Sequence, residues 1–298
     1  MTEDGRHHPT HKPRGRYGIP LTALLLTLAT AVFQTRTGPT YPLQGEFQAA
    51  GGSVRFFFAR SEVIGRDLPI VLLAPVPEEL RGRVRYRRYR SADAWTTVDM
   101  RPGSFFFHSR GVSRTLKGLG VMLPSLRERA GKYEYFVEVA EADGPFRSVT
   151  GEKPVYARYK APVPGWALVL HIAVIFVSLY LAMLAALLAA TGGSYRRTLT
   201  AAVAALLLGG FVLGPLVQWY AFGVWWSGFP LGYDWTDNKV VVELLFWLGA
   251  LWANRGQRRR PWTVVLAGIV TLAVFLVPHS IFGSEYNYLT GTGHGTAG

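Results

Sequence analysis

Long apolar runs dominate the second half of the chain. After Gly165, four of them follow one another with almost no charge, at residues 166–190, 199–222, 240–253 and 262–282. A run of about 20 apolar residues crosses the roughly 30 Å hydrocarbon core of a bilayer as a helix. A shorter run at residues 19–33 precedes them. The hydrophobic pattern therefore predicts a membrane protein with a segment near its N-terminus and four further transmembrane helices.

The chain between the first two runs has a different pattern, in which short apolar stretches are separated by turn residues. At residues 133–139 this pattern has period two, with tyrosines and valines on one face and Glu134 and Glu138 on the other. The candidate strands are residues 54–58, 69–73, 84–90, 95–98, 104–108, 133–139 and 154–159. About seven strands in roughly 120 residues favour an immunoglobulin-like or fibronectin-like β-sandwich.

These patterns predict a membrane α-helical bundle combined with an all-β domain. The expected parts are a cytoplasmic basic tail at residues 1–18, a transmembrane anchor or signal peptide at 19–35, an extracytoplasmic sandwich at 36–162, a four-helix transmembrane bundle at 163–284 and a flexible extracytoplasmic tail at 285–298. The second part keeps two interpretations, because its basic flank, its apolar stretch and Ala29-Thr30-Ala31 also fit a cleavable signal peptide.

The formal net charge of +13 matters mainly through where the basic residues lie. They precede the first apolar run and occupy the connections after the second and fourth runs, whereas residues 221–238 and the tail after Phe282 have none. Cytoplasmic loops are enriched in lysine and arginine, so the N-terminus is expected in the cytoplasm and both the sandwich and the C-terminus outside. This placement argues against nucleic acid as a partner. The absence of cysteine excludes disulfides and cysteine nucleophiles.

Arginines recur at strand period within one predicted strand. Arg81, Arg83, Arg85 and Arg87 would line one of its faces. The simpler interpretation is a solvated face that also protects a sheet edge from aggregation. The functional interpretation is that Arg83, Arg85 and Arg87 contact anionic lipid headgroups or an acidic partner.

Small residues mark helix contacts in the membrane half. At helical spacing, His171 shares a face of its helix with Ser178, Ala182, Ala185 and Ala189, and is therefore expected to point into the bundle.

Two further local patterns concern the next two helices. Gly210 and Gly214 form a small-xxx-small motif that allows close packing, and Pro215 is expected to disturb regular hydrogen bonding one turn earlier. Lys239 is expected to pair with Glu243, four residues further along.

The outer connection at residues 220–239 is aromatic, rich in glycine and carries Asp234 and Asp237. Tryptophan and tyrosine prefer the membrane–water interface, so a lipid-hugging aromatic loop is the simple interpretation. A cap for the following helix is expected from Thr236, Asp237 or Asn238.

Ionisable residues of the bundle gather at one predicted depth. By helical rise, His171 lies about 9 Å from the outer end of its helix and His279 about 6 Å from the outer end of the last one. Asp234, Asp237 and Glu285 belong to the adjoining outer connections. Ionisable groups in or beside a membrane span are costly, which makes them functional candidates.

Four interpretations of these ionisable residues stay open. In the structural one, the histidines bond loop backbone and the acids cap helices. In the metal one, His171, His279 and either Asp234 or Asp237 bind a divalent transition metal ion, since imidazole and carboxylate suit zinc, copper, nickel or iron. In the haem one, His171 and His279 ligate one b-type haem between helices. In the last, His279 and Asp237 perform acid–base catalysis, although the sequence has no recognisable catalytic motif.

The sequence also resembles a group of uncharacterised bacterial inner-membrane proteins, in which an exported immunoglobulin- or fibronectin-like domain precedes a four-helix bundle. The resemblance covers most of the chain after about residue 36. Its signatures are Gly214-Pro215, Gln218, Tyr220, Gly223, Gly228, Pro230, Asp234, residues 236–239, Pro278-His279-Ser280 and Gly283-Ser284-Glu285. The resemblance implies the same architecture and a bacterial inner-membrane location, and it implies no activity.

Together these observations predict an accessory membrane protein that holds a metal ion or haem near the outer face and docks a partner protein through its sandwich. One alternative is a purely structural or assembly subunit without a cofactor. Another is a membrane-embedded hydrolase or transferase.

Overall fold

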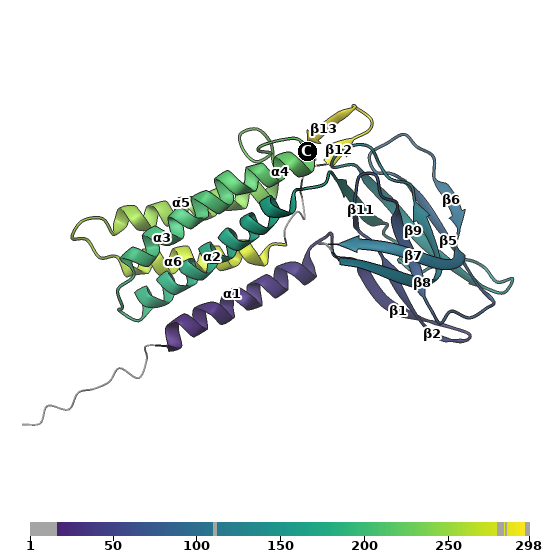
Figure 1. The fold of residues 1–298 in the computed structure, drawn as a ribbon, viewed down its shortest axis with the longest axis horizontal. Helices are drawn as coiled ribbons and strands as arrows, with labels where there is room; N and C mark the ends of the chain where they lie inside the picture. The colour runs from purple at the N-terminus through teal and green to yellow at the C-terminus, as the bar shows by residue number, and fades with distance from the viewer. Residues whose placement is uncertain (1–16, 110–111, 279–282, 284, 296–298) are drawn as a thin grey trace, which may run out of the picture.

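Helices fill one end of the molecule and strands fill the other (Figure 1). The computed structural model describes residues 17–109, 112–278, 283 and 285–295. The helical elements are α1 (Gly18–Thr37), α2 (Gly165–Ala190), α3 (Arg196–Leu206), the π-helix η1 (Leu207–Leu213), α4 (Gly214–Phe222), α5 (Trp235–Ala253) and α6 (Pro261–Leu276). The strands are β1 (Leu43–Ala49), β2 (Gly52–Phe58), β3 (Ser61–Val63), β4 (Leu68–Leu73), β5 (Leu80–Arg88), β6 (Thr96–Asp99), β7 (Arg101–Ser109), β8 (Val112–Leu123), β9 (Lys132–Glu141), β10 (Arg147–Ser148), β11 (Val155–Lys160), β12 (Glu285–Asn287) and β13 (Thr292–Gly295).

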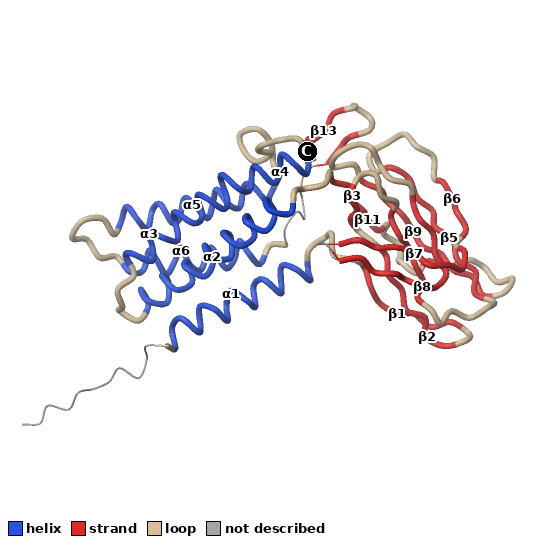
Figure 2. The backbone as a smooth tube through the Cα atoms, in the orientation of Figure 1, coloured by secondary structure: helices blue, strands red, loops and turns tan. Residues whose placement is uncertain are grey.

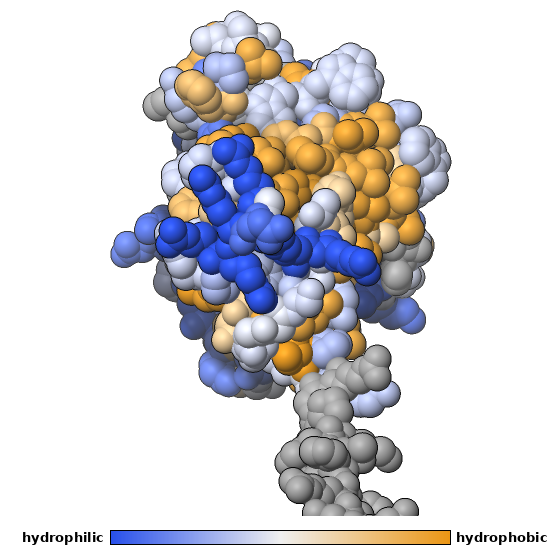
Figure 3. Space-filling model, turned by 90° about the vertical axis from the view of Figure 1, so that its left-hand side faces the viewer, coloured by the Kyte–Doolittle hydropathy of each residue, from blue (hydrophilic) through white to orange (hydrophobic). Residues whose placement is uncertain are grey.

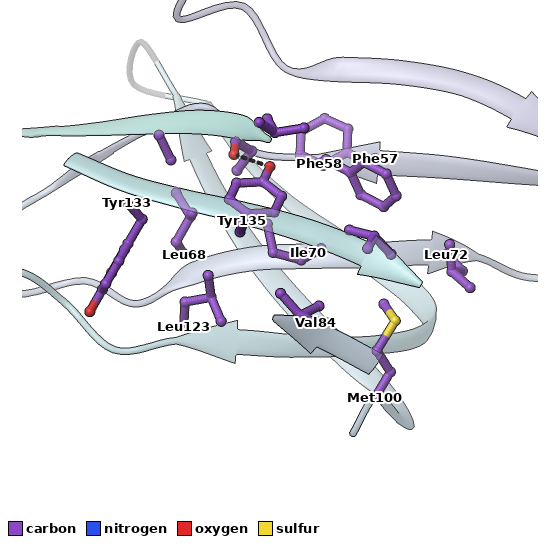
Figure 4. Close-up of a cluster of buried hydrophobic side chains, with 14 of the residues drawn as sticks. Phe57, Phe58, Leu68, Ile70, Leu72, Val84, Met100, Leu123, Tyr133 and Tyr135 are labelled. Carbon is purple, nitrogen blue, oxygen red and sulfur yellow. Dashed lines mark hydrogen bonds between the residues drawn. The ribbon is translucent and has the colours of Figure 1, made fainter. Parts of the chain in front are cut away.

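Two β-sheets share one apolar core. The first has the order β1-β2-β4-β8-β7, and the second has the order β3-β11-β9-β5-β6 with β10 paired to β9. Phe58 and Ile70 from the first sheet pack with Val84 and Tyr135 from the second (Figure 4). The ring of Tyr135 is fully buried, and its hydroxyl donates a hydrogen bond to the Ala59 carbonyl at 2.8 Å. The core therefore buries this polar group with its bond satisfied.

Each of the seven predicted stretches overlaps a strand of this sandwich. The period-two prediction for β9 is confirmed, because its tyrosines and valines at 133, 135, 137 and 139 are all buried in the core. The prediction that the arginine strand protects a sheet edge is wrong, since β5 lies between β9 and β6. Strands β1, β3, β8 and β10 were not predicted.

The helices bury small side chains and expose large apolar ones, unlike the helices of a water-soluble bundle. On α2, the small residues Ser178, Ala182, Ala185 and Ala189 are buried, whereas larger side chains such as Val177 are exposed. Packing through small residues, with large apolar residues outward, is typical of helices in lipid. The predicted small-residue stripe on α2 is thus confirmed.

Three helical stretches are long and apolar enough to cross a membrane: α1, α2 and the continuous run from α3 through α4, residues Arg196–Phe222. Helix α6 is apolar but shorter, with 16 residues. Helix α5 packs against α6 and carries charged residues in its first half. The chain therefore has several membrane-compatible helices combined with two β-sheets.

Helix α1 packs on the bundle through small side chains. Ala23, Thr27 and Thr30 are buried against it, while leucines on the opposite side of α1 are exposed. At the end of α1 nearer the sandwich, Gln34 Nε2 donates to the carbonyls of Phe275 and Val277 just where α6 ends. The helix is thus fixed to α2 and α6 along its length.

The predicted disturbance before Pro215 is confirmed, because η1 ends at Leu213, directly before Gly214 and Pro215. Proline has no N–H to donate and crowds the preceding turn, so the chain widens into π-helical bonding there. Gly210 packs closely on α5, since a methyl group at this glycine would lie 2.7 Å from Val240 Cγ1.

Two predicted boundaries are wrong. The last helix was expected to run to residue 282 but ends at Leu276, because Val277 precedes Pro278 and is extended, as residues before proline prefer. The tail after residue 284 was expected to be flexible, yet β12 and β13 form an antiparallel hairpin. The Tyr286 N–H of this hairpin donates to the Ala130 carbonyl of the sandwich at 3.1 Å.

The basic connections lie together at the end of the bundle remote from the sheets. Figure 2 shows the α2–α3 and α5–α6 loops at that end, and Figure 3 looks onto it and shows hydrophilic side chains gathered there. The exposed basic residues of these connections are Arg196, Arg197, Arg255, Arg258, Arg259 and Arg260. Tyr195 Oη donates to Asn254 Oδ1 at 2.8 Å and so joins the two loops.

Candidate functional site

Asp234 is the N-cap of α5. Its Oδ1 accepts a hydrogen bond of 2.8 Å from the Thr236 N–H, which satisfies one of the free donors in the first turn. The prediction that Thr236, Asp237 or Asn238 would be the cap is therefore wrong by a few residues. The reason is that the helix begins at Trp235, ahead of the apolar pattern that was used to place its start.

Asp237 holds the α4–α5 loop onto α5. Its Oδ2 accepts hydrogen bonds from the Ser227 N–H at 2.7 Å, the Gly228 N–H at 3.1 Å and Gln218 Nε2 at 3.2 Å. The Ser227 hydroxyl lies 3.1 Å from the same oxygen and 3.3 Å from Asp234 Oδ2. The structure therefore brings the two predicted aspartates together on Ser227, and both serve to fold the loop back on the helix.

His171 points into the bundle, as predicted. Its Nδ1 lies 3.1 Å from the Gly209 carbonyl of η1, and its Cε1 would lie 3.6 Å from a methyl group at Gly214. His279, the proposed second ligand, lies outside the described residues. Within the described part of the chain, no three histidine or acidic side chains are grouped closely enough to hold a metal ion.

A buried polar chain joins α5 to α6. Trp247 Nε1 donates to Thr271 Oγ1 at 2.8 Å, and the Thr271 hydroxyl donates to Glu243 Oε1 at 2.9 Å. All three side chains are almost fully buried. The predicted ion pair between Lys239 and Glu243 is not formed. Lys239 Nζ instead donates to the Val277 carbonyl at 2.9 Å. Sequence reasoning missed Thr271, whose only signal was a hydroxyl within an apolar helix.

The predicted arginine face exists on the outer side of β5, and glutamates of β9 order it. Arg83 Nε lies 2.6 Å and Arg85 Nη1 3.3 Å from Glu138, while Arg87 Nε lies 2.6 Å from Glu134. The signal for these pairs was present in the sequence, because Glu134 and Glu138 occupy the outward positions of β9.

Aromatic rings lie against the same guanidinium groups. The Arg83 guanidinium lies 3.9 Å from the ring centre of Phe146, and that of Arg87 lies 4.6 Å from Trp95. We name Arg83, Arg85, Arg87, Trp95, Phe136 and Phe146 the arginine–aromatic face. Between a third and two fifths of each arginine side chain in it is exposed, at 32%, 39% and 35%. The arginines are thus held in place and accessible.

A second charged cluster lies where the sandwich meets the bundle. Glu285, the first residue of the C-terminal hairpin, lies 2.5 Å from Lys132 Nζ and 2.9 Å from Arg90 Nε. The backbone joins the two layers nearby, because the Ala161 N–H donates to the Ala221 carbonyl at 2.9 Å. Burial and, to a smaller extent, the nearby Arg158 lower the pKa of Lys132 to about 8, against the opposing effect of Glu285. We name Arg90, Lys132, Arg158 and Glu285 the junction cluster.

Lys132 should make stability depend on pH between about 8 and 10. Its pKa of about 8 in the folded chain lies below the ordinary lysine pKa of 10.5, so the unfolded chain binds the extra proton and stability should rise with pH across this window. We expect the melting temperature of the full chain in phosphate-free buffer to rise over this range, and the rise to shrink in Lys132→Met. The exposed Lys117→Met is the matched control, and a profile unchanged in Lys132→Met would contradict the assignment.

The comparisons with known proteins give no relative from which a function follows. No family model matches the chain, and no curated protein or solved structure matches it either.

Proposed function

We propose that this chain is an integral protein of a bacterial inner membrane, with its N-terminus and basic loops in the cytoplasm and its sandwich outside. Support comes from the outward-facing apolar side chains of α1 and α2 and from the arginines gathered at the end remote from the sheets. The contacts of α1 with α2 and α6 favour an uncleaved anchor over a signal peptide.

We also infer an immunoglobulin-type strand order for the sandwich. In their order across each sheet, β2, β4, β8 and β7 correspond to strands A, B, E and D of that fold, and β11, β9, β5 and β6 correspond to G, F, C and C′. Such sandwiches often act as binding modules, but the fold alone carries no function.

The function that the geometry supports best is a membrane-anchored docking subunit. The observation that carries this proposal is the arginine–aromatic face. Arginine and tryptophan are enriched among residues that dominate binding energy in protein interfaces. Here the arginines are already ordered by Glu134 and Glu138, so a partner loses less side-chain entropy on binding them. The expected partner is a protein with an acidic surface.

Charge reversal at Arg85 tests this proposal. Arg85→Glu should weaken an acidic partner's binding by about tenfold or more, because it places like charges in the interface. Glu138 keeps its closer contact with Arg83, so the sheet should stay folded. The measurement is the size of the native complex extracted in mild detergent from membranes of the bacterium that makes the protein.

The matched control is Arg114→Glu, which makes the same charge change at an exposed position of β8 in the other sheet. The proposal predicts a complex for the wild-type chain and for Arg114→Glu, and its loss in Arg85→Glu. A wild-type chain that runs alone, or a complex that survives Arg85→Glu, would rule the proposal out.

A bound metal ion or b-type haem at His171 remains the second candidate. It is favoured by the contact of Nδ1 with a backbone carbonyl. Metal-binding histidines usually donate the N–H of one ring nitrogen to such a group and bind the metal through the other nitrogen. The test is elemental analysis and a visible spectrum of the purified chain. Stoichiometric metal or a Soret band that disappears in His171→Ala supports the cofactor, and its absence from the wild-type chain excludes it.

A further inference from the structure

The charge pairing on the outer face of the second sheet breaks down at the junction with the bundle. Two arginines of β5 stand directly across from glutamates of β9, Arg83 from Glu138 and Arg87 from Glu134. At the end of β9, however, Lys132 stands directly across from Arg158 of β11. Like charges directly opposite one another destabilise an antiparallel pair. Two cations therefore stand across from each other on a face where Arg83 and Arg87 each stand across from a glutamate.

Among the described residues, Glu285 is the carboxylate that forms an ion pair with a member of this pair, and it is shared with Arg90. Glu285 contacts Lys132 and Arg90, and Arg158 takes no part in that contact. Among the described residues, Arg158 forms no ion pair within 4 Å and no side-chain hydrogen bond, although it is only 8% exposed. Its guanidinium lies 5.8 Å from the ring centre of Phe222, the last residue of α4.

A buried guanidinium without hydrogen bonds is costly. Desolvating a charge costs several kcal/mol unless a partner and hydrogen bonds compensate, so burial lowers the pKa of Arg158 although Asp234 and Glu285 act in the opposite direction. The C-terminal end of α4 offers about half a negative charge, which offsets part of this cost. The five N–H donors of the guanidinium have no hydrogen-bond acceptor among the described residues.

The position of Arg158 indicates which kind of anion it would bind. Arg158 belongs to β11, the strand that leads to the end of α4, and its contact with Phe222 places it beside the start of the aromatic loop that follows α4. The side chains of Arg90 and Lys132 are 28% and 15% exposed, so an anion can reach the junction cluster from the surface at these two residues. A planar guanidinium beside a lysine is suited to the several oxygens of a phosphate group.

We propose that Arg158 and Lys132, with Arg90 beside them, bind a phosphate group at the junction between the sandwich and the bundle. The group comes from the headgroup of an outer-leaflet phospholipid or from inorganic phosphate. The arginines that the sequence suggested for contact with headgroups or an acidic partner, Arg83, Arg85 and Arg87, each form an ion pair with a glutamate of β9. Arg158 forms none with the described residues. This inference does not depend on the docking function proposed above.

The test is thermal unfolding of the full chain in a maltoside detergent, which contains no phosphate. One arm adds sodium phosphate against sodium chloride at equal ionic strength, and a second adds short-chain phosphatidylglycerol. At about 100 times the dissociation constant, either probe should raise the melting temperature of the wild-type chain by roughly 5 °C. A rise with both probes assigns the site to phosphate in general, and a rise with the lipid alone assigns it to a headgroup.

Arg158→Gln should abolish most of the rise, and Arg81→Gln, which removes an exposed arginine from the same sheet, should preserve it. In chloride alone, Arg158→Gln should be at least as stable as the wild-type chain, because it removes an unsatisfied buried charge. Lys132→Met should weaken the response about tenfold, and it serves as the test if Arg158→Gln does not fold. No rise in the wild-type chain, an equal rise in Arg158→Gln, or a loss of stability of Arg158→Gln in chloride overturns the proposal.

Discussion

Replacing Gly268 by alanine is expected to destabilise the bundle by about 2–3 kcal/mol, the range for forcing extra atoms into a well-packed core. A methyl group at Gly268 would lie 2.4 Å from Ala186 Cβ, far inside van der Waals contact. Both carbons are fixed to helix backbones, so neither can turn away and α6 must move off α2. Between helices in lipid, such close packing is the main source of attraction. The measurement is the free energy of unfolding of the full chain in detergent.

Two variants separate this contact from a general effect of glycine. Gly249→Ala in α5 adds a methyl group where nothing lies within 4 Å, and should be neutral or slightly stabilising. In the double variant Gly268→Ala with Ala186→Gly, the methyl group moves from one helix to the other and stability should largely return. If the double variant is as unstable as Gly268→Ala alone, the α2–α6 contact does not explain the loss.

Much of the fold could be predicted because hydrophobic burial determines it locally. The alternation of Tyr133, Glu134 and Tyr135 specified both faces of β9, and the stripe from Ser178 to Ala189 specified the buried face of α2. In both cases the relevant partner is simply the apolar side of a neighbour, whichever neighbour that is. Such patterns therefore give the faces of an element but not its position in a sheet.

The order of the strands was not accessible in this way. The sequence of β5 is typical of an edge strand, because an arginine occupies every second position. In the structure, β9 supplies Glu134 and Glu138, about 50 residues away in sequence, and these carboxylates pair with the arginines. The alternating patterns of β9 and of β5 each predicted the faces of their strand correctly. The glutamates of β9 and the arginines of β5 could be matched only once the structure showed that the two strands are paired.

The candidate site shows the same limit in the membrane half. His171 and the outer aspartates were placed at one depth by counting along helices, and depth alone does not place side chains together. Asp234 and Asp237 met on Ser227, a residue that has no ionisable group and gave no signal. Glu285 was assigned to a flexible tail, although it is the shared acid of the junction cluster. Long-range contacts of this kind depend on where loops return.

Gly118→Ala is expected to have the larger effect, about 4 kcal/mol or more, and to unfold part of the sandwich. Strand β8 was not predicted, since Gly118 and Gly120 interrupt its apolar pattern and glycine weakens strands. The structure gives the reason for the first glycine. A methyl group at Gly118 would lie 1.9 Å from the Leu72 carbonyl oxygen and 3.0 Å from the Ala74 nitrogen, both in the backbone of the neighbouring chain segment. Backbone atoms of a central strand have no room to yield.

The effect of Gly118→Ala should appear as early thermal unfolding and as protease cleavage within residues 43–160 of the full chain. Gly103→Ala is the matched control, because Gly103 stands directly across from Gly118 on β7 and a methyl group there would meet only the Phe105 ring, at an ordinary 3.5 Å. If both variants melt alike, the close approach of β8 to β4 is not what requires the glycine. If only Gly118→Ala fails, the residue that hid β8 from the sequence pattern is also the one that lets β8 lie between β4 and β7 in its sheet.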